Sequence, residues 1–179
     1  MEMNQLNLFS SSEDATEELG QAVGCELRAG DCVVLSGQLG AGKTTLTRGL
    51  ARGMAISDRV SSPSYLLCHE YSGDPPLLHL DAYFQERISS LLHDGLAERF
   101  NQAVVVVEWG EQISDWLPAD RLELLLEAEV EPEKGPEEQC RRKIQLNAGG
   151  ERSSQLLIAI SAQLDSLGSG LSTKIWPEA

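Results

Sequence analysis

The residues best suited to chemistry form a glycine-rich run in the first third of the chain. From Gly37 to Thr44 the sequence GQLGAGKT matches the pattern G-x-x-x-x-G-K-[ST] at every fixed position. In such a loop the backbone N–H groups and the start of the following helix converge on a phosphate, and glycines leave room for the backbone to wrap around it. Lys43 would reach the β- and γ-phosphates of a nucleotide, and the Thr44 hydroxyl would bind Mg²⁺. The sequence therefore predicts a nucleotide-binding P-loop.

Two acidic residues follow apolar runs and are candidates to complete this site. Glu108 comes directly after Val104–Val107, a run typical of a strand covered on both faces. A P-loop protein holds Mg²⁺ from the protein side as well as through phosphate oxygens, so Glu108 is the predicted second metal ligand. The alternative for Glu108 is a strand-end acid that faces water. Asp81 ends the run LLHLD, where it would orient an attacking water or contact the metal through water. The alternative for Asp81 is a carboxylate that caps a turn.

Nearby residues are accessory candidates. His79 lies two positions before Asp81, on the same face of the predicted strand. Trp109 is as suited to packing over the core as to lining the site. The run Ser61-Ser62-Pro63-Ser64 is either a mobile loop that reaches the γ-phosphate or an ordinary serine-rich turn.

The elements that must position these residues alternate between helix and strand patterns. Apolar residues at helical spacing predict helices, and short apolar or β-branched runs bounded by glycine, proline and serine predict strands. The predicted helices span 13–30, 43–54, 88–100 and 153–164. The predicted strands span 31–37, 65–71, 77–80, 104–107, 121–130 and 140–148, with a charged linker over 131–139.

This alternation predicts an α/β fold: a single P-loop NTPase domain with a mixed central sheet flanked by helices. The predicted domain spans residues 13–167, after a polar leader over 1–12 and before a flexible tail over 168–179. The 179 residues, 41% of them hydrophobic, suffice for one core of ordinary size.

Charge and cysteine usage limit the partners and the compartment. The formal net charge of −14 disfavours unaided binding to nucleic acid or to an anionic membrane. The four cysteines include no CxxC pair, and no apolar run is long enough for a leader peptide or a membrane span. A reduced, cytoplasmic protein is the expectation.

Taken together, the motifs resemble the bacterial TsaE (YjeE-type) family, the small P-loop ATPases of tRNA threonylcarbamoyladenosine biosynthesis. The segments that carry the resemblance are GQLGAGKTT at 37–45, VSSPSY at 60–65, HLDAYF at 79–84 and VVVVEWGE at 104–111. Their order and spacing match, and the similarity runs from about Glu13 to about Ile160. Ser64 replaces the usual threonine and keeps the hydroxyl, whereas Phe84 replaces the usual arginine and loses the cation.

The resemblance implies an ATPase that binds ATP and Mg²⁺, with Thr44 and Glu108 on the metal and Asp81 near the attacking water. It also implies that TsaD and TsaB subunits are partners, that ATP hydrolysis drives turnover of their assembly, and that this chain does not bind tRNA directly. The predicted nucleotide-binding residues are Glu13, Gly37, Gln38, Leu39, Gly40, Ala41, Gly42, Lys43, Thr44 and Thr45, with Glu13 near the adenine. The predicted catalytic residues are Lys43, Asp81 and Glu108, and the accessory ones are Ser62, Ser64, His79, Tyr83 and Trp109.

Other classes of P-loop protein fit the sequence less well. A small-molecule kinase of the shikimate-kinase type needs a cationic lid, and the sequence offers no arginine-rich lid segment between its later helices. A GTPase would carry an N-K-x-D sequence, which does not occur. A non-catalytic nucleotide-sensing subunit would differ from the ATPase only in turnover.

Overall fold

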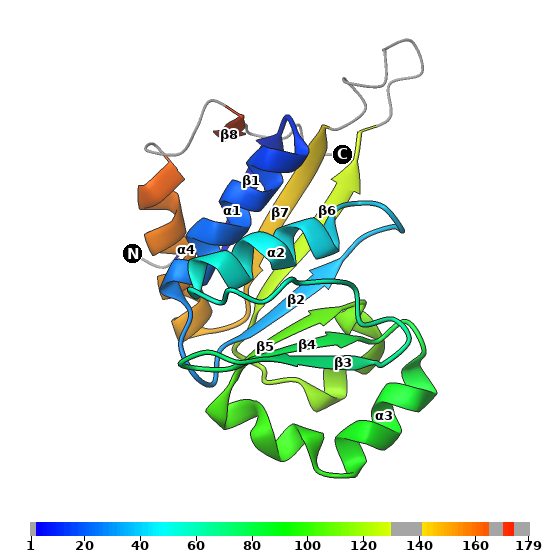
Figure 1. Ribbon diagram of the computed structural model, residues 1–179. Helices are drawn as coiled ribbons and strands as arrows, with labels where there is room; N and C mark the ends of the chain where they lie inside the picture. The colour runs from blue at the N-terminus through cyan, green and yellow to red at the C-terminus, as the bar shows by residue number, and fades with distance from the viewer. Residues whose placement is uncertain (1–2, 130–140, 165–169, 174–179) are drawn as a thin grey trace.

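The computed structural model describes residues 3–129, 141–164 and 170–173. The strands in these residues form one eight-stranded mixed sheet (Figure 1). The strand order is β3-β4-β5-β2-β6-β7-β1-β8. β4, β5, β2 and β6 pair in parallel, and the other neighbours pair antiparallel. The strands are β1 Gln5–Ser10, β2 Cys32–Ser36, β3 Cys68–Tyr71, β4 Leu77–Asp81, β5 Val104–Glu108, β6 Leu122–Ala128, β7 Arg142–Ala148 and β8 Leu171–Thr173.

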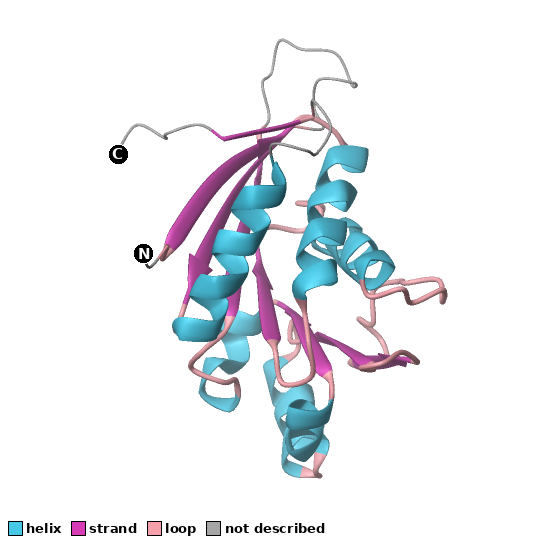
Figure 2. Cartoon of the chain, turned by 90° about the vertical axis from the view of Figure 1, so that its left-hand side faces the viewer, coloured by secondary structure: helices cyan, strands magenta, loops and turns pink. Residues whose placement is uncertain are grey.

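Helices pack on both faces of this sheet and enclose two cores. α1, α2 and α4 cover one face, while α3 and two 3₁₀ helices, η1 and η2, cover the other (Figures 1 and 2). The valines of β5 alternate between the two cores, which explains why the run is apolar throughout. The helices are α1 Glu13–Glu26, α2 Lys43–Gly53, α3 Gln85–His93, η1 Leu96–Gln102, η2 Gly110–Trp116 and α4 Glu151–Leu164. The predicted α/β class with a mixed, helix-flanked sheet is confirmed.

The sheet extends beyond both predicted ends of the domain. Residues 5–10, predicted to belong to a polar leader, form β1, which lies between β7 and β8 and buries Leu8 completely. Residues 171–173, predicted to belong to a flexible tail, form β8 on the edge next to β1. The sheet therefore includes one segment on each side of 13–167, because pairing with distant strands recruits both. The linker over 131–139 and the end of the tail over 174–179 lie outside the described residues.

Two predicted elements are shorter than expected because the backbone turns inside them. The predicted helix over 88–100 is interrupted at Gly95, whose φ of 108° separates α3 from η1. The predicted strand over 65–71 begins only at Cys68, because Leu67 adopts a φ of 66° that no strand allows.

α1 and α2 lie side by side (Figure 1), and glycines allow their backbones to approach closely. A Cβ atom added at any of these positions would overlap a backbone carbonyl oxygen of the facing helix. The glycines are Gly20 and Gly24 on α1 and Gly49 and Gly53 on α2. Because α2 begins at the P-loop and α1 begins at Glu13, this contact sets the position of both around the site.

We expect Gly49→Ala to lower the free energy of unfolding by at least about 2 kcal/mol, because the new methyl group would overlap the Glu17 carbonyl oxygen. Without such an overlap, Gly→Ala inside a helix stabilises a protein by about 1 kcal/mol. A loss of stability in Gly49→Ala would therefore come from the overlap of the methyl group with the facing helix. Urea denaturation monitored by circular dichroism measures the change. Arg52→Ala, on the exposed side of α2, is the control and should cost less than about 1 kcal/mol. A Gly49→Ala protein as stable as the wild type would contradict the close helix contact.

Candidate functional site

The glycine-rich loop connects the end of β2 to the start of α2, the strand, loop and helix order that the sequence predicts. Gly37, Gly40 and Gly42 all have positive φ, at 138°, 79° and 105°. A side chain at Gly37 would also overlap the Leu126 carbonyl on the neighbouring strand β6. The loop conformation therefore depends on these glycines, as in a backbone cradle for an anion.

A cavity of about 360 Å³ opens over the loop. Its lining comes from the P-loop, the start of α1, the serine-rich loop, the ends of β4 and β5, and the start of β7. The lining residues are Glu13, Leu39, Gly40, Gly42, Lys43, Thr44, Thr45, Ser62, Ser64, Asp81, Glu108, Trp109 and Arg142. Of the residues predicted for the site, Gly37, Gln38 and Ala41 build the loop without lining the cavity. His79 is fully buried behind the wall of the cavity, and Tyr83 is an exposed residue outside its lining.

Lys43 is a buried cation at the base of the cavity, with only 4% of the residue exposed. Its ammonium donates to the carbonyl oxygens of Gly37, at 2.7 Å, and Gln38, at 3.0 Å, and lies 3.9 Å from the centre of the Trp109 ring. Burial lowers the pKa of Lys43, and the carboxylates of Glu108, Glu111 and Asp81 oppose that shift. No carboxylate among the described residues is within ion-pairing distance of the ammonium. An anion in the cavity would supply the missing partner.

Glu108 and Thr44 meet on the wall of the cavity. The Thr44 hydroxyl donates to Glu108 Oε1 at 2.8 Å. The same oxygen lies 3.0 Å from Nε2 of His79, which is fully buried behind it. Parallel pairing of β4 with β5 puts Asp81 directly opposite Glu108. The two predicted acids are thus brought together at one edge of the sheet.

Asp81 caps a turn, as the alternative interpretation predicts, and its side chain also lines the cavity. Its Oδ1 accepts from the Tyr83 backbone N–H at 2.9 Å, and its Oδ2 accepts from the Ser64 hydroxyl at 2.7 Å. Ser64 is in turn 2.7 Å from the Ser62 hydroxyl. The serine-rich loop is therefore connected to the acidic edge of the site.

Trp109 lines the cavity rather than only packing over the core. It has a φ of 61°, which is uncommon for a bulky residue and turns the chain directly after β5. Its indole lies against Lys43 on one side and makes an edge contact with the Tyr83 ring, 5.4 Å away between centroids. The Tyr83 ring thus contacts the site through Trp109, while its backbone N–H contacts it through Asp81.

Glu13 and Arg142 lie toward the start of α1. Arg48 donates to Glu13 and lowers the pKa of its carboxyl, and the Thr45 hydroxyl donates to the same carboxylate at 3.3 Å. Arg142 of β7 was not predicted, yet its Nε donates to the Ala41 carbonyl at 2.8 Å and its side chain fills the space that Gly42 leaves open. No local motif marks Arg142, because only the pairing of β7 with β1 and β6 brings it to the loop.

The donor set of the cavity fits a hard cation that also needs ligands from elsewhere. The Thr44 hydroxyl and the Glu108 carboxylate are oxygen donors of the kind that Mg²⁺ prefers. Within the described residues, no cluster of three or more histidine, cysteine, aspartate or glutamate side chains could hold a metal. Phosphate oxygens and water would have to complete the coordination shell.

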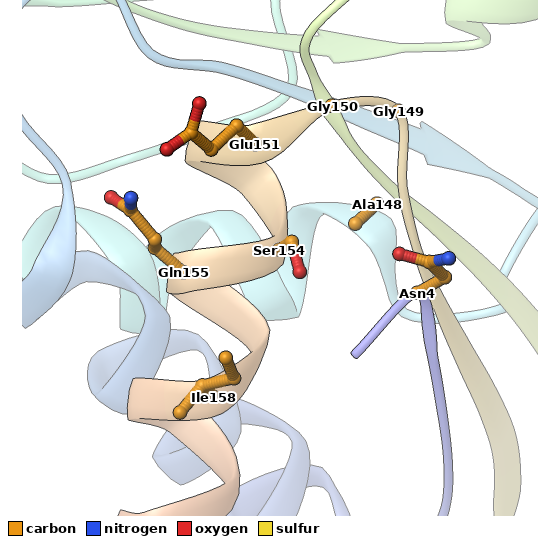
Figure 3. Close-up of a pocket in the computed structure, with 8 residues that line it drawn as sticks. All are labelled: Asn4, Ala148, Gly149, Gly150, Glu151, Ser154, Gln155 and Ile158. Carbon is orange, nitrogen blue, oxygen red and sulfur yellow. The ribbon is translucent and has the colours of Figure 1, made fainter. Parts of the chain in front are cut away.

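A second hollow, of about 490 Å³, lies beside the start of α4 (Figure 3). Asn4 and Ala148 line one side, and Glu151, Ser154, Gln155 and Ile158 follow the helix on the other. The helix start is already capped, because Asp120 accepts from the backbone N–H groups of residues 152 and 153. These two N–H groups are therefore not available to an anion in the hollow.

Among the described helices, none has the length and apolar character needed to cross a bilayer.

The chain is similar to known proteins in sequence and in structure. The family model described as "Threonylcarbamoyl adenosine biosynthesis protein TsaE" matches residues 10–139. The tRNA threonylcarbamoyladenosine biosynthesis protein TsaE of Streptomyces coelicolor is 46% identical over 120 residues, covering 63% of this chain and 79% of that protein. The protein of the same name from Bacillus subtilis is 35% identical over 161 residues, covering 89% and 96%. The crystal structure of Bacillus subtilis YdiB superimposes with a TM-score of 0.74 at 30% identity, covering 91% of this chain and 99% of that one.

We expect Lys43→Met to weaken binding of ADP and ATP by roughly 10- to 100-fold, because a charged hydrogen-bond donor to the phosphates is lost. The melting temperature should stay the same or rise, since the buried ammonium no longer has to be desolvated. Calorimetric titration and thermal denaturation measure the two effects. Lys143→Met is the matched control, because Lys143 follows Arg142 on β7 and points to the opposite face of the sheet. Unchanged nucleotide affinity in the Lys43 variant would exclude this cavity as the nucleotide site.

Proposed function

This chain belongs to the TsaE family of tRNA threonylcarbamoyladenosine biosynthesis, and we propose from that premise that it is a Mg²⁺-dependent ATPase. In this proposal it binds ATP over the P-loop and hydrolyses it to drive turnover of a TsaD–TsaB assembly. The observation that carries the proposal is the convergence of Lys43, Thr44, Asp81 and Glu108 on one cavity above a glycine loop.

Each of these residues has a distinct part in the proposed hydrolysis. The Lys43 ammonium, now satisfied by two backbone carbonyls, neutralises β- and γ-phosphate charge. Thr44 and Glu108 hold Mg²⁺, which when bound supplies positive charge at the phosphate oxygens. Asp81, fixed by Ser64 and by the turn at Tyr83, orients the attacking water.

Turnover by the isolated protein should be slow. The guanidinium that lines the cavity, that of Arg142, is engaged with the P-loop carbonyl of Ala41. A cation supplied by a partner at the γ-phosphate can be worth ~10³ or more in rate. The TsaD–TsaB assembly is therefore the proposed source of stimulation.

Exposed apolar side chains near the mouth of the cavity support a protein partner there. Leu39 lines the cavity and is 92% exposed, and Tyr65, directly after the lining residue Ser64, is 93% exposed. Tyr83 and Phe84 are also exposed and contact each other edge to face. Phe84, where the family's usual arginine is absent, adds to this apolar rim. Grouped exposed apolar residues are typical of an interaction surface.

The net charge of −14 supports a role in which the partners, and not this chain, hold the tRNA.

The alternative of a shikimate-kinase-type enzyme has less support, because the cavity carries three carboxylates, those of Glu13, Asp81 and Glu108, against two cations. Phosphate transfer from ATP to shikimate would favour that alternative.

We expect Glu108→Gln to weaken the apparent affinity for Mg²⁺ by roughly 10- to 100-fold and to suppress ATP hydrolysis, because the amide loses the charge that attracts the cation. ADP affinity in EDTA should be unchanged. Phosphate release at varied Mg²⁺ and calorimetry in EDTA separate the two effects. Glu123→Gln is the control, since Glu123 pairs with Arg121 and does not line the cavity. Equal activity of Glu108→Gln and wild type at all Mg²⁺ concentrations would remove Glu108 from the metal site.

We expect the protein to bind the TsaD–TsaB assembly more tightly with ATP than with ADP, because the loop from Ser62 to Ser64 is connected to Asp81 in the cavity. Tyr65→Ser should weaken this binding about tenfold or more without changing ATP affinity. Ile158→Ser, at an exposed apolar residue of α4, is the control and should have no effect. Sedimentation and calorimetry with the assembly, and with tRNA alone, provide the measurement. Tight binding to tRNA alone, or no binding to the assembly with any nucleotide, would contradict the proposed partnership.

A further inference from the structure

His79 is a buried polar side chain whose hydrogen bonding is only half satisfied. It lies on β4, two residues before Asp81, with no surface exposed. Its Nε2 is 3.0 Å from Glu108 Oε1, while its Nδ1 has no hydrogen-bond partner within the described part of the chain. The histidine opposite it on β3, His69, differs in that its Nδ1 lies 3.1 Å from the Tyr71 hydroxyl.

The contact with Glu108 determines where the proton of the ring is. A carboxylate only accepts hydrogen bonds, so Nε2 of His79 must be the donor. In the neutral ring, Nδ1 is then an acceptor without a donor. A buried polar atom in this state costs free energy that an apolar residue of similar size would avoid. An apolar residue would fill this part of the core at a lower cost. The histidine is therefore explained by the hydrogen bond that its Nε2 donates to Glu108.

That bond fixes one oxygen of the Glu108 carboxylate. Oε1 accepts from both His79 Nε2 and the Thr44 hydroxyl. Oε2 has no hydrogen bond to any described residue, and Glu108 lines the cavity, so this oxygen is available to a ligand. Two donors converging on one oxygen leave the carboxylate little freedom to rotate.

We propose that His79 is a positioning residue for Glu108. It holds the carboxylate so that its second oxygen faces a metal–nucleotide complex in the cavity. This inference rests on the proposed function, because it assumes that Glu108 serves a nucleotide-bound Mg²⁺. Partners that orient a metal-binding carboxylate commonly change metal affinity by 10- to 100-fold when they are removed. His79 itself contacts neither metal nor nucleotide.

The test compares variants that keep or lose a donor at the position of Nε2. Gln at position 79 can place its amide nitrogen near the original Nε2, whereas Asn carries the same amide too close to the backbone, and Leu carries no donor. His93→Leu is the control, because His93 is exposed on α3 and makes an edge contact with Trp116, and neither residue lines the cavity. The probe is Mn²⁺ in place of Mg²⁺. Electron paramagnetic resonance measures Mn²⁺ binding to the ADP-saturated protein, and calorimetry in EDTA measures ADP binding without metal.

We expect Mn²⁺ affinity to fall roughly 10- to 100-fold in His79→Asn and His79→Leu and to stay within about threefold of wild type in His79→Gln and His93→Leu. ADP affinity in EDTA should be the same in all. If His79→Leu does not fold, the Gln and Asn variants decide the question.

Several results would overturn the inference. Wild-type Mn²⁺ affinity in His79→Asn would do so, as would an equal loss in His79→Gln and His79→Asn. A parallel loss of metal-free ADP binding in His79→Asn would show a structural role instead. These outcomes leave the proposed function intact, whereas a wild-type protein that binds no Mn²⁺ with ADP would overturn both.

Discussion

Parallel hydrogen bonding between β2, β5 and β4 is the constraint on which the rest of the site depends. Strands that run in the same direction end at the same edge of the sheet, and here the register pairs Leu35 with Glu108 and Asp81 with Glu108. The P-loop follows β2 directly, so the backbone cradle and both carboxylates arrive at one place. A register change of a single residue would turn these side chains to the opposite face.

The electrostatics of the cavity follow from this convergence. Lys43 is desolvated at the foot of the loop, and its charge is held by carbonyl dipoles and by carboxylates that act from a distance. Glu108 is almost fully buried, yet it has hydrogen-bond donors in Thr44 and His79. In this site the Lys43 ammonium lies near carboxylates, but among the described residues none of them forms a direct ion pair with it. This arrangement supports the proposal of a ligand that carries both anionic oxygens and a cation.

The helices around the sheet hold this arrangement from two sides. Glycines on α1 and α2 let the two helices touch through their backbones, which places Glu13 beside Thr45 at the start of α2. On the other side of the loop, β7 brings Arg142 to the Ala41 carbonyl. The antiparallel half of the sheet, β7 with β1 and β8, thus contributes to the P-loop and is not only an extension of the core.

The sequence alone determined those features that depend on neighbours along the chain. The P-loop pattern, the all-valine strand with Glu108 at its end, and the alternation of helix and strand each carry a local signal, because glycine conformation and apolar periodicity are properties of short segments. The tertiary structure decided the features that arise between distant segments. β1 mixes polar and apolar residues and β8 has only three residues, so their place in the sheet follows from the pairing of β1 with β7 and β8. Arg142 reaches the loop only through strand order. The contacts that His79 and Thr44 make with one oxygen of Glu108 join three elements, and hydrogen bonds of that kind are set by geometry in space and not by spacing in sequence.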